Sequence, residues 1–594
     1  MPVRVLLLIT VFLAPSIRWP HKLSADEQLT PTIMRVADSP EADYTFRMAG
    51  PADETLLFTA PGFNHVGEPR SASETDAGHL QITVRNAHSG EPIPCRINVV
   101  GPEGHYYEPA EHVLKTFSLT GEWPKSGWGN RQSKAPIRYI GRFFYSSGIS
   151  SVDVPAGTVR VEVWKGFEYR PITKTIDVVA DTTQQMTLTL EHTIPTQDYG
   201  YYPGDPHIHI HRRDETDEAR ILDLMQAEDI QFGTILAYNE PAGPYDGFMN
   251  RMAFRQDQGI GRRSVSSRGD YSILSGQEYR SRYYGHINFF LVDQLVANGS
   301  SYNADNWPPF GLVARRVREQ GGIAFFAHGG YALEIYADVV QNNLDGVELL
   351  QFGVYRGIGL NDWYHMLNTG FRIPANGACD YPACRKLGDC KTYVAVNGDP
   401  NMENWLRGMA AGRSFVTSGP VLLLEVDGVQ PGDQIERSGN GPHQVTAKIR
   451  VRSEVAPVTN VQLIANGRIV RELTVSHKAG QGRWLELEQT IECDASTWIA
   501  ARAFSQSVTG TPDAESHTNP VYVVIDDKAP YSQNSLDVLV GAIDRQITIH
   551  KKRDFEEQDR VVAYFERSRN ILMKLREIDG APAAGHPSDI VPTP

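Results

Sequence analysis

The chain has 594 residues, 41% of them hydrophobic and 22% charged, with a formal net charge of −14. This length exceeds what one hydrophobic core normally serves, so we expect several domains, and the composition excludes a mainly disordered or collagen-like chain. The acidic charge argues against nucleic acid as a partner, because like charges repel, but not against a small phosphoester.

Residues 1–25 predict a secretory signal peptide. Arg4 precedes an apolar run from Val5 to Ala14, and a small-residue stretch follows around Ser24 and Ala25. Such a run is too short to cross a bilayer as a helix, and no later stretch is long and apolar enough to do so. We therefore expect export to a periplasm or the outside, with no membrane span. A misassigned start of the chain is the alternative.

Two segments follow before the centre of the chain. Residues 26–76 show little periodicity and predict a linker or lead-in. From 77 to 194, short runs with alternating apolar residues recur between turn signals, as in HLQITVRN and TVRVEVW. A period of two predicts an antiparallel β-sandwich, and we expect it to serve as a scaffold.

Residues 195–420 alternate helical and strand-like patterns, as where DEARILDLMQAEDI leads to FGTILAY and FGLVARRVREQ leads to GGIAFFAH. This alternation predicts parallel β/α units, barrel-like or doubly wound, with chemistry at the carboxyl ends of the strands. Strand patterns return over 421–527 and predict a second sandwich, and helical spacing over 528–594 predicts a helical tail. The expected fold class is therefore multidomain α/β plus all-β.

Metal-ligand residue types gather at the predicted strand ends. GDPHIHIH places three histidines on one face of a strand, which alone is a weak signal. Acids and histidines also stand at the ends of the other predicted strands of this region. Imidazole and carboxylate together hold zinc, manganese or iron. The residues are His207, His209, His211, Glu278, His286, His328 and Asp380.

In this order the motifs resemble a known family. GDPHIHIH, SGQEYRSRYYGHINFF, FFAHGG and ANGACDYPA, followed by TYVAV and GRSFVTSGP, are similar to the PHP (polymerase and histidinol phosphatase) superfamily, in its CehA/McbA-like metallohydrolase branch. The resemblance spans roughly residues 199–420. It implies a distorted PHP-type β/α barrel, flanked here by the two sandwiches.

The resemblance also implies a set of metal ligands. The first ion maps onto His207, His209, Glu278 and Asp380, and the second onto the bridging Glu278 with His286 and His328. A third site is lost, because Tyr238 and Asn239 stand where the superfamily often has an aspartate-histidine pair, and Asp380, Tyr381 and Pro382 stand where it would have DxH. We therefore expect two divalent ions, zinc by preference with manganese or iron as alternatives, and a role for His211 beside the centre or towards the substrate.

Two ions bridged by a carboxylate activate a water and polarise the bond under attack. We therefore expect an exported hydrolase of an ester, amide or carbamate bond, with Glu278 and Asp380 as its catalytic carboxylates. Asp380 is expected to orient the water or to carry its proton. Polar residues near the strand ends are candidates to contact the substrate or to support the ligands: His211, Asn239, Glu240, Asn288, Glu348, Arg385 and Tyr393.

Several alternatives stay open. The loss of a third ion and the acidic charge favour carboxyl chemistry over a phosphatase or phosphodiesterase, which is the second hypothesis. A non-catalytic carbohydrate- or surface-binding protein is the third. We expect a small or saccharide-linked molecule as the substrate. Cys379, Cys384 and Cys390 share one loop, where one local disulfide or separate thiols would both fit.

Overall fold

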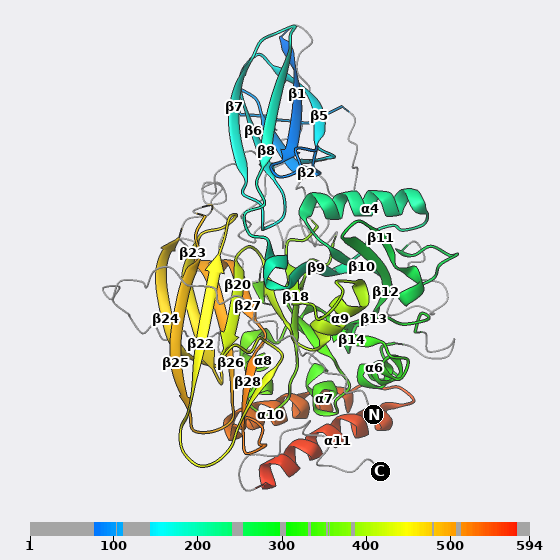
Figure 1. Cartoon of the computed structure of the whole chain (residues 1–594). Helices are drawn as coiled ribbons and strands as arrows, with labels where there is room; N and C mark the ends of the chain where they lie inside the picture. Colours follow the sequence, from blue (N-terminus) through cyan, green and yellow to red (C-terminus); the bar gives the residue numbers. More distant parts are fainter. Residues whose placement is uncertain are drawn as a thin grey trace, which may run out of the picture.

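The computed structural model shows a multidomain chain in which β-sheets predominate and a few helices cover them (Figure 1). The expectation of a multidomain, sheet-rich fold is confirmed. The predictions for the signal peptide, almost all of the lead-in, Glu240, Cys384 and Arg385 lie outside the described residues. The structure describes residues 76–102, 104–110, 143–239, 253–296, 304–330, 334–351, 354–355, 357–381, 387–477, 480, 482–506 and 512–578.

The first sandwich packs a sheet of order β5-β1-β8 against one of order β3-β2-β6-β7, in which β4 also pairs with β2. Alternating residues such as Leu80, Val99 and Val161 fill the core between the sheets. The pairing is not wholly antiparallel as predicted, since β1 and β8 run parallel. The strands are β1 (Ala77–Asn86), β2 (Cys95–Val100), β3 (Tyr106–Tyr107), β4 (Phe144–Ser146), β5 (Ile149–Pro155), β6 (Gly157–Trp164), β7 (Ile172–Val178) and β8 (Thr183–Leu190).

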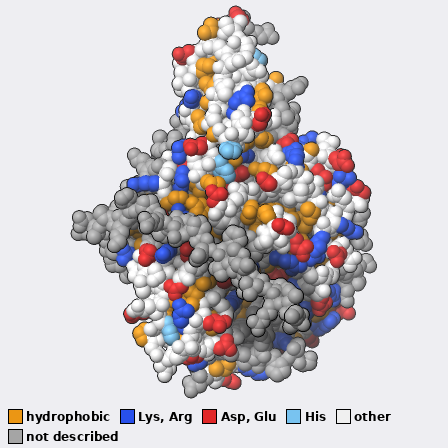
Figure 2. Space-filling model, viewed as in Figure 1, with side chains coloured by type: hydrophobic (Ala, Val, Ile, Leu, Met, Phe, Trp, Pro, Cys, Tyr) orange, Lys and Arg blue, Asp and Glu red, His pale blue; other side chains and the backbone are white. Residues whose placement is uncertain are grey.

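This sandwich stands out from the rest of the molecule as a separate lobe (Figure 2). It is anchored on the end of helix α4 (Glu215–Glu228). The guanidinium of Arg96 lies 3.0 Å from the Glu228 carboxylate, and both side chains are buried. Tyr145 donates a 2.8 Å hydrogen bond to the same carboxylate. Buried charge needs such partners, so Glu228 fixes the lobe on the central part of the chain.

The central sheet brings the ends of many strands to one rim. Its neighbours, in order, are β9, β10, β12, β13, β14, β15 and β17; β13 is antiparallel to both neighbours and the others are parallel. A bridge between Ile208 and Tyr381 connects the two ends, so the sheet curls like part of a barrel. The strands are β9 (Tyr201–Ile208), β10 (Phe232–Tyr238), β12 (Tyr271–Ser281), β13 (Gly285–Phe290), β14 (Ile323–Phe326), β15 (Gly346–Gln351) and β17 (Ala375–Ala378).

Short elements cover the outside of this sheet and line its edges. Phe310, Val313 and Val317 of α6 are buried in the same core as the strand residues Ile287 and Phe326. The elements are η1 (Thr196–Tyr199), η3 (Gly261–Ser264), β11 (Ser266–Arg268), α6 (Phe310–Glu319), η4 (Ala327–Gly329), α7 (Ile335–Val340), β16 (Val354–Tyr355), α8 (Gly359–Leu367) and α9 (Met402–Ala410).

The sheet does not stop at the central region. From β9 it continues through β18, β19, β27 and β26 to β23 and β24, while β28 and β21 follow on from β26. A second sheet of order β20-β22-β25 packs on this continuation around Leu424, Ile449 and Leu463. The strands are β18 (Lys391–Ala395), β19 (Ser414–Thr417), β20 (Val421–Val426), β21 (Gln434–Arg437), β22 (His443–Arg452), β23 (Val458–Ala465), β24 (Arg468–His477), β25 (Leu485–Cys493), β26 (Thr497–Gln506), β27 (Pro512–Thr518) and β28 (Val521–Ile525).

Two long helices, α10 (Gln533–His550) and α11 (Gln558–Glu577), end the described chain and cover α7 and α8 (Figure 1). Leu539 and Phe565 enter the same hydrophobic core as the central sheet. Among the described helices, none is both long and apolar enough to cross a membrane.

A pair of buried carboxyls lies where α11 meets α7. Tyr564 donates a 2.6 Å hydrogen bond to Asp338, and the backbone N–H of Phe310 donates one of 2.8 Å to Glu334. Oδ2 of Asp338 and Oε2 of Glu334 have no hydrogen-bond partner within the described residues. Burial raises the pKa of Asp338 to about 7 and the pKa of Glu334 well above its usual value.

We predict that Asp338→Asn stabilises the protein at pH 8. Because the folded-state pKa is raised, the folded chain holds a proton that the unfolded chain has lost, and stability falls as the pH rises from about 4 to about 7. An amide does not titrate there, so the free energy of unfolding at pH 8 rises by roughly 1–4 kcal/mol. Denaturant unfolding across this pH range measures the effect. Exposed Asp554→Asn is the control, and parallel curves for wild type and Asp338→Asn would contradict the prediction.

Candidate metal centre

The rim of the central sheet brings the six predicted ligands together. His207 lies in β9 and His209 just beyond it, Glu278 lies in β12, and His286 is the second residue of β13. His328 and Asp380 follow β14 and β17. Because β13 runs against its neighbours, its first residues meet the last residues of the parallel strands. Strand direction therefore gathers these side chains from five separate parts of the chain.

Two of the six side chains sit on unusual backbone. His328 has φ of 55° and Asp380 has φ of 51°, both in the left-handed region that residues other than glycine rarely adopt. Each follows the end of a strand, so the turn redirects the side chain towards the rim. Strained backbone of this kind concentrates at functional sites, where the surrounding structure holds it in place.

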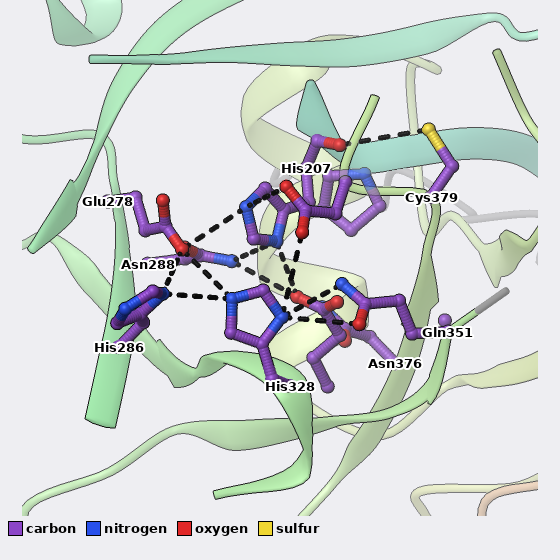
Figure 3. A network of polar contacts seen from close by, with 12 residues as sticks. His207, Glu278, His286, Asn288, His328, Gln351, Asn376 and Cys379 are labelled. Carbon is purple, nitrogen blue, oxygen red and sulfur yellow. Dashed lines mark hydrogen bonds and ion pairs between the residues drawn. The ribbon is translucent and has the colours of Figure 1, made fainter. Parts of the chain in front are cut away.

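The Glu278 carboxylate is the hub of the cluster (Figure 3). Its Oε1 lies 2.9 Å from Nδ1 of His286, 3.1 Å from Nε2 of His328 and 3.5 Å from Nε2 of His207. Its Oε2 lies 3.2 Å from Nε2 of His209 and also accepts from Arg280. Burial alone would raise the pKa of Glu278, but Arg280, His286 and His207 lower it well below the usual value, so the carboxylate is ionised.

Hydrogen bonds on the outer side of two histidines decide which nitrogens face the centre. Nδ1 of His209 donates to the carbonyl oxygen of Leu236 at 2.9 Å, and Nδ1 of His207 donates to the Glu348 carboxylate at 2.7 Å. In a neutral ring the other nitrogen, Nε2, then carries a lone pair. The two Nε2 atoms lie 3.1 Å apart. Two lone pairs repel at that distance unless a cation, either a proton or a metal ion, lies between them.

These donors can hold a metal ion. In three overlapping groups the ligand atoms all lie within 4.8 Å of one another: His207, His209 and Glu278; Glu278, His286 and His328; and His207, His328 and Asp380. Imidazole nitrogen with carboxylate oxygen is a donor set for zinc, manganese and iron alike. The two Glu278 oxygens face different histidines.

The electrostatics of the cluster agree with a cation site. Burial alone would lower the pKa of His207, but Glu348, Asp380 and Glu278 raise it well above the usual value. Burial lowers the pKa of His286 to about 4, so this ring is neutral and its lone pair is available at neutral pH. Burial would raise the pKa of Asp380, but His207, His209 and His328 hold it below its usual range.

Three further side chains support the ligands. Asn288 donates to Glu348 at 3.3 Å and lies 3.1 Å from Nδ1 of His207. The amide of Gln351 lies beside Nδ1 of His328. Asn288 and Glu348 were candidates for substrate contact, yet both are fully buried. Their position instead fixes the orientation of the His207 ring.

Other predicted residues lie elsewhere. Tyr393 was predicted near the strand ends that carry the ligands, and this prediction is wrong. Because β18 runs antiparallel to β9, Tyr393 pairs with Pro203 near the opposite end of β9 and stacks on Phe415. Asn239 is buried and binds the backbone of Arg280 rather than facing a ligand. His211 is half-buried beyond β9 and, among the described residues, is not one of the converging donors.

Arg280 is a residue of the centre that the sequence pattern did not reveal. Its Nε donates to Oε2 of Glu278 at 2.5 Å, and its Nη2 lies 3.3 Å from Nε2 of His209. Its guanidinium stacks on the ring of Tyr238, 3.9 Å from the ring centre. Its place two residues after Glu278, on the same face of β12, was the one signal that could have found it.

A fourth group of donors, Glu168, His192 and Asp229, lies near the first sandwich. Here the protein already satisfies the carboxylate: Glu168 accepts from the backbone N–H and hydroxyl of Thr196 and pairs with His192 at 2.8 Å. The hydroxyl of Tyr271 donates a 3.1 Å hydrogen bond to Oδ1 of Asp229. This cluster therefore has the character of a structural network rather than of a metal site.

Comparison with known proteins leaves the family of this chain open. No family model matches the sequence. No curated protein matches it either. The assignment of function therefore depends on the site itself.

Solved structures give only weak similarities. PsfC from Pseudomonas syringae PB-5123 aligns with 35% of this chain and 88% of its own, at 13% identity and a TM-score of 0.24. GBS52, the minor pilin of Streptococcus agalactiae, aligns with 20% of this chain and 45% of its own, at 10% identity and a TM-score of 0.13. The chain thus spans less than half of the pilin. Similarities at this level establish neither a shared fold nor a function.

We predict that His207→Ala lowers the amount of transition metal that copurifies with the protein. The change removes a nitrogen common to two of the donor groups, and affinity falls with the number of ligands. Inductively coupled plasma mass spectrometry of protein purified without chelators measures the metal content. His211→Ala is the matched control and should retain the metal, whereas equal metal content in wild type and His207→Ala would exclude the centre.

Glu348→Gln tests the hydrogen bond from Nδ1 of His207 to the Glu348 carboxylate. An amide in place of the carboxylate weakens the acceptor for Nδ1 of His207, and loss of such a partner lowers metal affinity by about 10–100-fold. Competition with a chromophoric chelator gives the affinity. Glu319→Gln, on the exposed face of α6, controls for loss of charge, and an unchanged affinity in Glu348→Gln would show that the bond has no such role.

Proposed function

We propose that this protein is a metal-dependent hydrolase that cleaves an ester, amide or carbamate bond. The observation that carries the proposal is the convergence of four histidines on the buried Glu278 carboxylate, with the Nε2 atoms of His207 and His209 facing each other at 3.1 Å. The resemblance of the strand-end motifs to the CehA/McbA-like branch of the PHP superfamily supports it. A PHP-type barrel, with its two-ion centre, is part of the same proposal.

The ligands divide between two ions. His207, His209 and Asp380 would hold the first, His286 and His328 the second, and Glu278 would bridge them. Two divalent ions, zinc by preference with manganese or iron as alternatives, supply Lewis acidity that lowers the pKa of a water and polarises the bond under attack.

Side chains of the protein admit the substrate and orient the water. The side chains of Asp380 and His286 are 12% and 20% exposed, whereas those of His207 and Glu278 are fully buried. A substrate therefore approaches on the side of Asp380 and His286. The ionised Asp380 carboxylate can accept a hydrogen bond from a water on that side and so orient it towards the substrate. His207 and Glu278 stay shielded from bulk solvent and keep the site fixed.

A phosphoesterase is the second candidate, and Arg280 is the observation that favours it. Its guanidinium donates to Glu278, and its side chain is 22% exposed. A fixed positive charge stabilises the negative charge that develops when a phosphoester is attacked. The same charge would also stabilise the oxyanion formed from a carboxyl ester, so the two candidates are separated by substrate.

Turnover of paired substrates tests both candidates. We expect metal-loaded protein to hydrolyse p-nitrophenyl acetate, to lose this activity on treatment with a chelator, and to regain it with zinc or manganese. His328→Ala, which removes a ligand, should lower kcat by about 100-fold or more. His365→Ala, on α8 and outside the cluster, is the matched control and should retain activity.

Other outcomes of the same assays would contradict the first candidate. Turnover of p-nitrophenyl phosphate alone would show that the protein is a phosphoesterase. Full activity in His328→Ala would show that turnover does not depend on this ligand and would overturn the proposed centre. A purified protein without transition metal and without turnover of either substrate would favour the third hypothesis, a non-catalytic binding protein.

A further inference from the structure

Arg280 has a positive charge at the centre that metal binding does not require. It lies at the end of β12, where Asn239 holds its backbone through hydrogen bonds to both its N–H and its carbonyl oxygen. The Tyr238 ring supports the guanidinium plane from one side. Its side chain is 22% exposed, compared with 12% for that of Asp380. The guanidinium is thus held in place, while the side chain as a whole keeps partial exposure to solvent.

Binding of a cation changes what Arg280 can donate to. In the structure its Nη2 lies 3.3 Å from Nε2 of His209. A nitrogen that binds a metal ion has no lone pair left to accept a hydrogen bond. When His209 binds a cation, Arg280 therefore loses this acceptor and keeps only Glu278. Its Nη1 has no hydrogen-bond partner within the described chain. The guanidinium then has N–H donors left for a further acceptor.

The charge balance points in the same direction. Glu278, Asp380 and Glu348 contribute three negative charges to the cluster and Arg280 one positive charge, so the side chains alone carry a surplus of two negative charges when the histidines are neutral. Two divalent cations would reverse this to a surplus of two positive charges. An anion would then be attracted, and Arg280 is the protein group placed to pair with it.

We propose that Arg280 binds an anionic oxygen group of the substrate, a carboxylate or a phosphate, beside the bond that is cleaved. The proposal rests on the proposed function for the statement that this anion belongs to a substrate. The anion-binding site itself depends only on the geometry around Arg280. Planar guanidinium groups bind carboxylate and phosphate through two parallel hydrogen bonds, which also orients the bound molecule.

Isothermal titration calorimetry of metal-loaded protein tests the proposal, with inorganic phosphate and acetate as separate probes. We expect Arg280→Met to weaken the binding of at least one of these anions by about tenfold or more, because it removes the charge-assisted hydrogen bonds, and Arg280→Lys to restore part of it. The anion that loses more affinity identifies the substrate group. Arg282→Met is the matched control, because Arg282 pairs with Asp305 and its side chain is 62% exposed.

Arg280 also contacts Glu278, so metal content is measured on the same samples. An affinity that falls only in proportion to lost metal would overturn the proposal, as would equal affinity in wild type and Arg280→Met, or no binding of either anion to wild type. If Arg280→Met does not fold, Tyr238→Leu takes its place. This change removes the ring that supports the guanidinium, so it should lower the affinity for the same anion. Absence of turnover together with Arg280-dependent binding would refute the hydrolase and leave the anion site standing.

Discussion

The centre depends on one buried carboxylate, that of Glu278, which needs several partners at once. Glu278 is fully buried, and an isolated charge in that position would cost several kcal/mol of stability. Three histidines and an arginine lie within 3.3 Å of its two oxygens, and they come from three strand ends besides its own. No local segment could supply such partners. The curl of the sheet is therefore the condition for the charge to be buried, and the charge in turn makes the rim able to attract cations.

Much of this arrangement could be read from the sequence. The spacing of His207 and His209 at two residues, and the placing of Glu278, His328 and Asp380 after apolar runs, follow from the alternation of a strand and from where strands end. Parallel strands place their carboxyl ends together, so the sequence alone groups these residues. Helical and strand patterns likewise indicated a multidomain chain with much sheet.

Other features depend on contacts that no pattern shows. Tyr393 was expected near the rim, but the direction of β18 relative to β9 is decided by pairing and places it near the other end. Arg280 resembles an ordinary surface residue at a strand end, and its role appears only when Glu278, His209 and Tyr238 surround it. The same holds for Glu348 and Asn288, whose burial beside His207 decides that they support a ligand instead of facing solvent.

The continuous sheet from β9 through β18 and β19 into β27 has a consequence for how this protein can be inherited. A cut near Pro420 looks like a natural boundary in the sequence, yet it would separate β19 from β27 and leave an open row of backbone donors and acceptors. The segment with the candidate metal ligands is therefore not an independent folding unit. Recombination that moves this segment without the strands that follow would transfer an incomplete sheet. We therefore expect the segment and those strands to be inherited together.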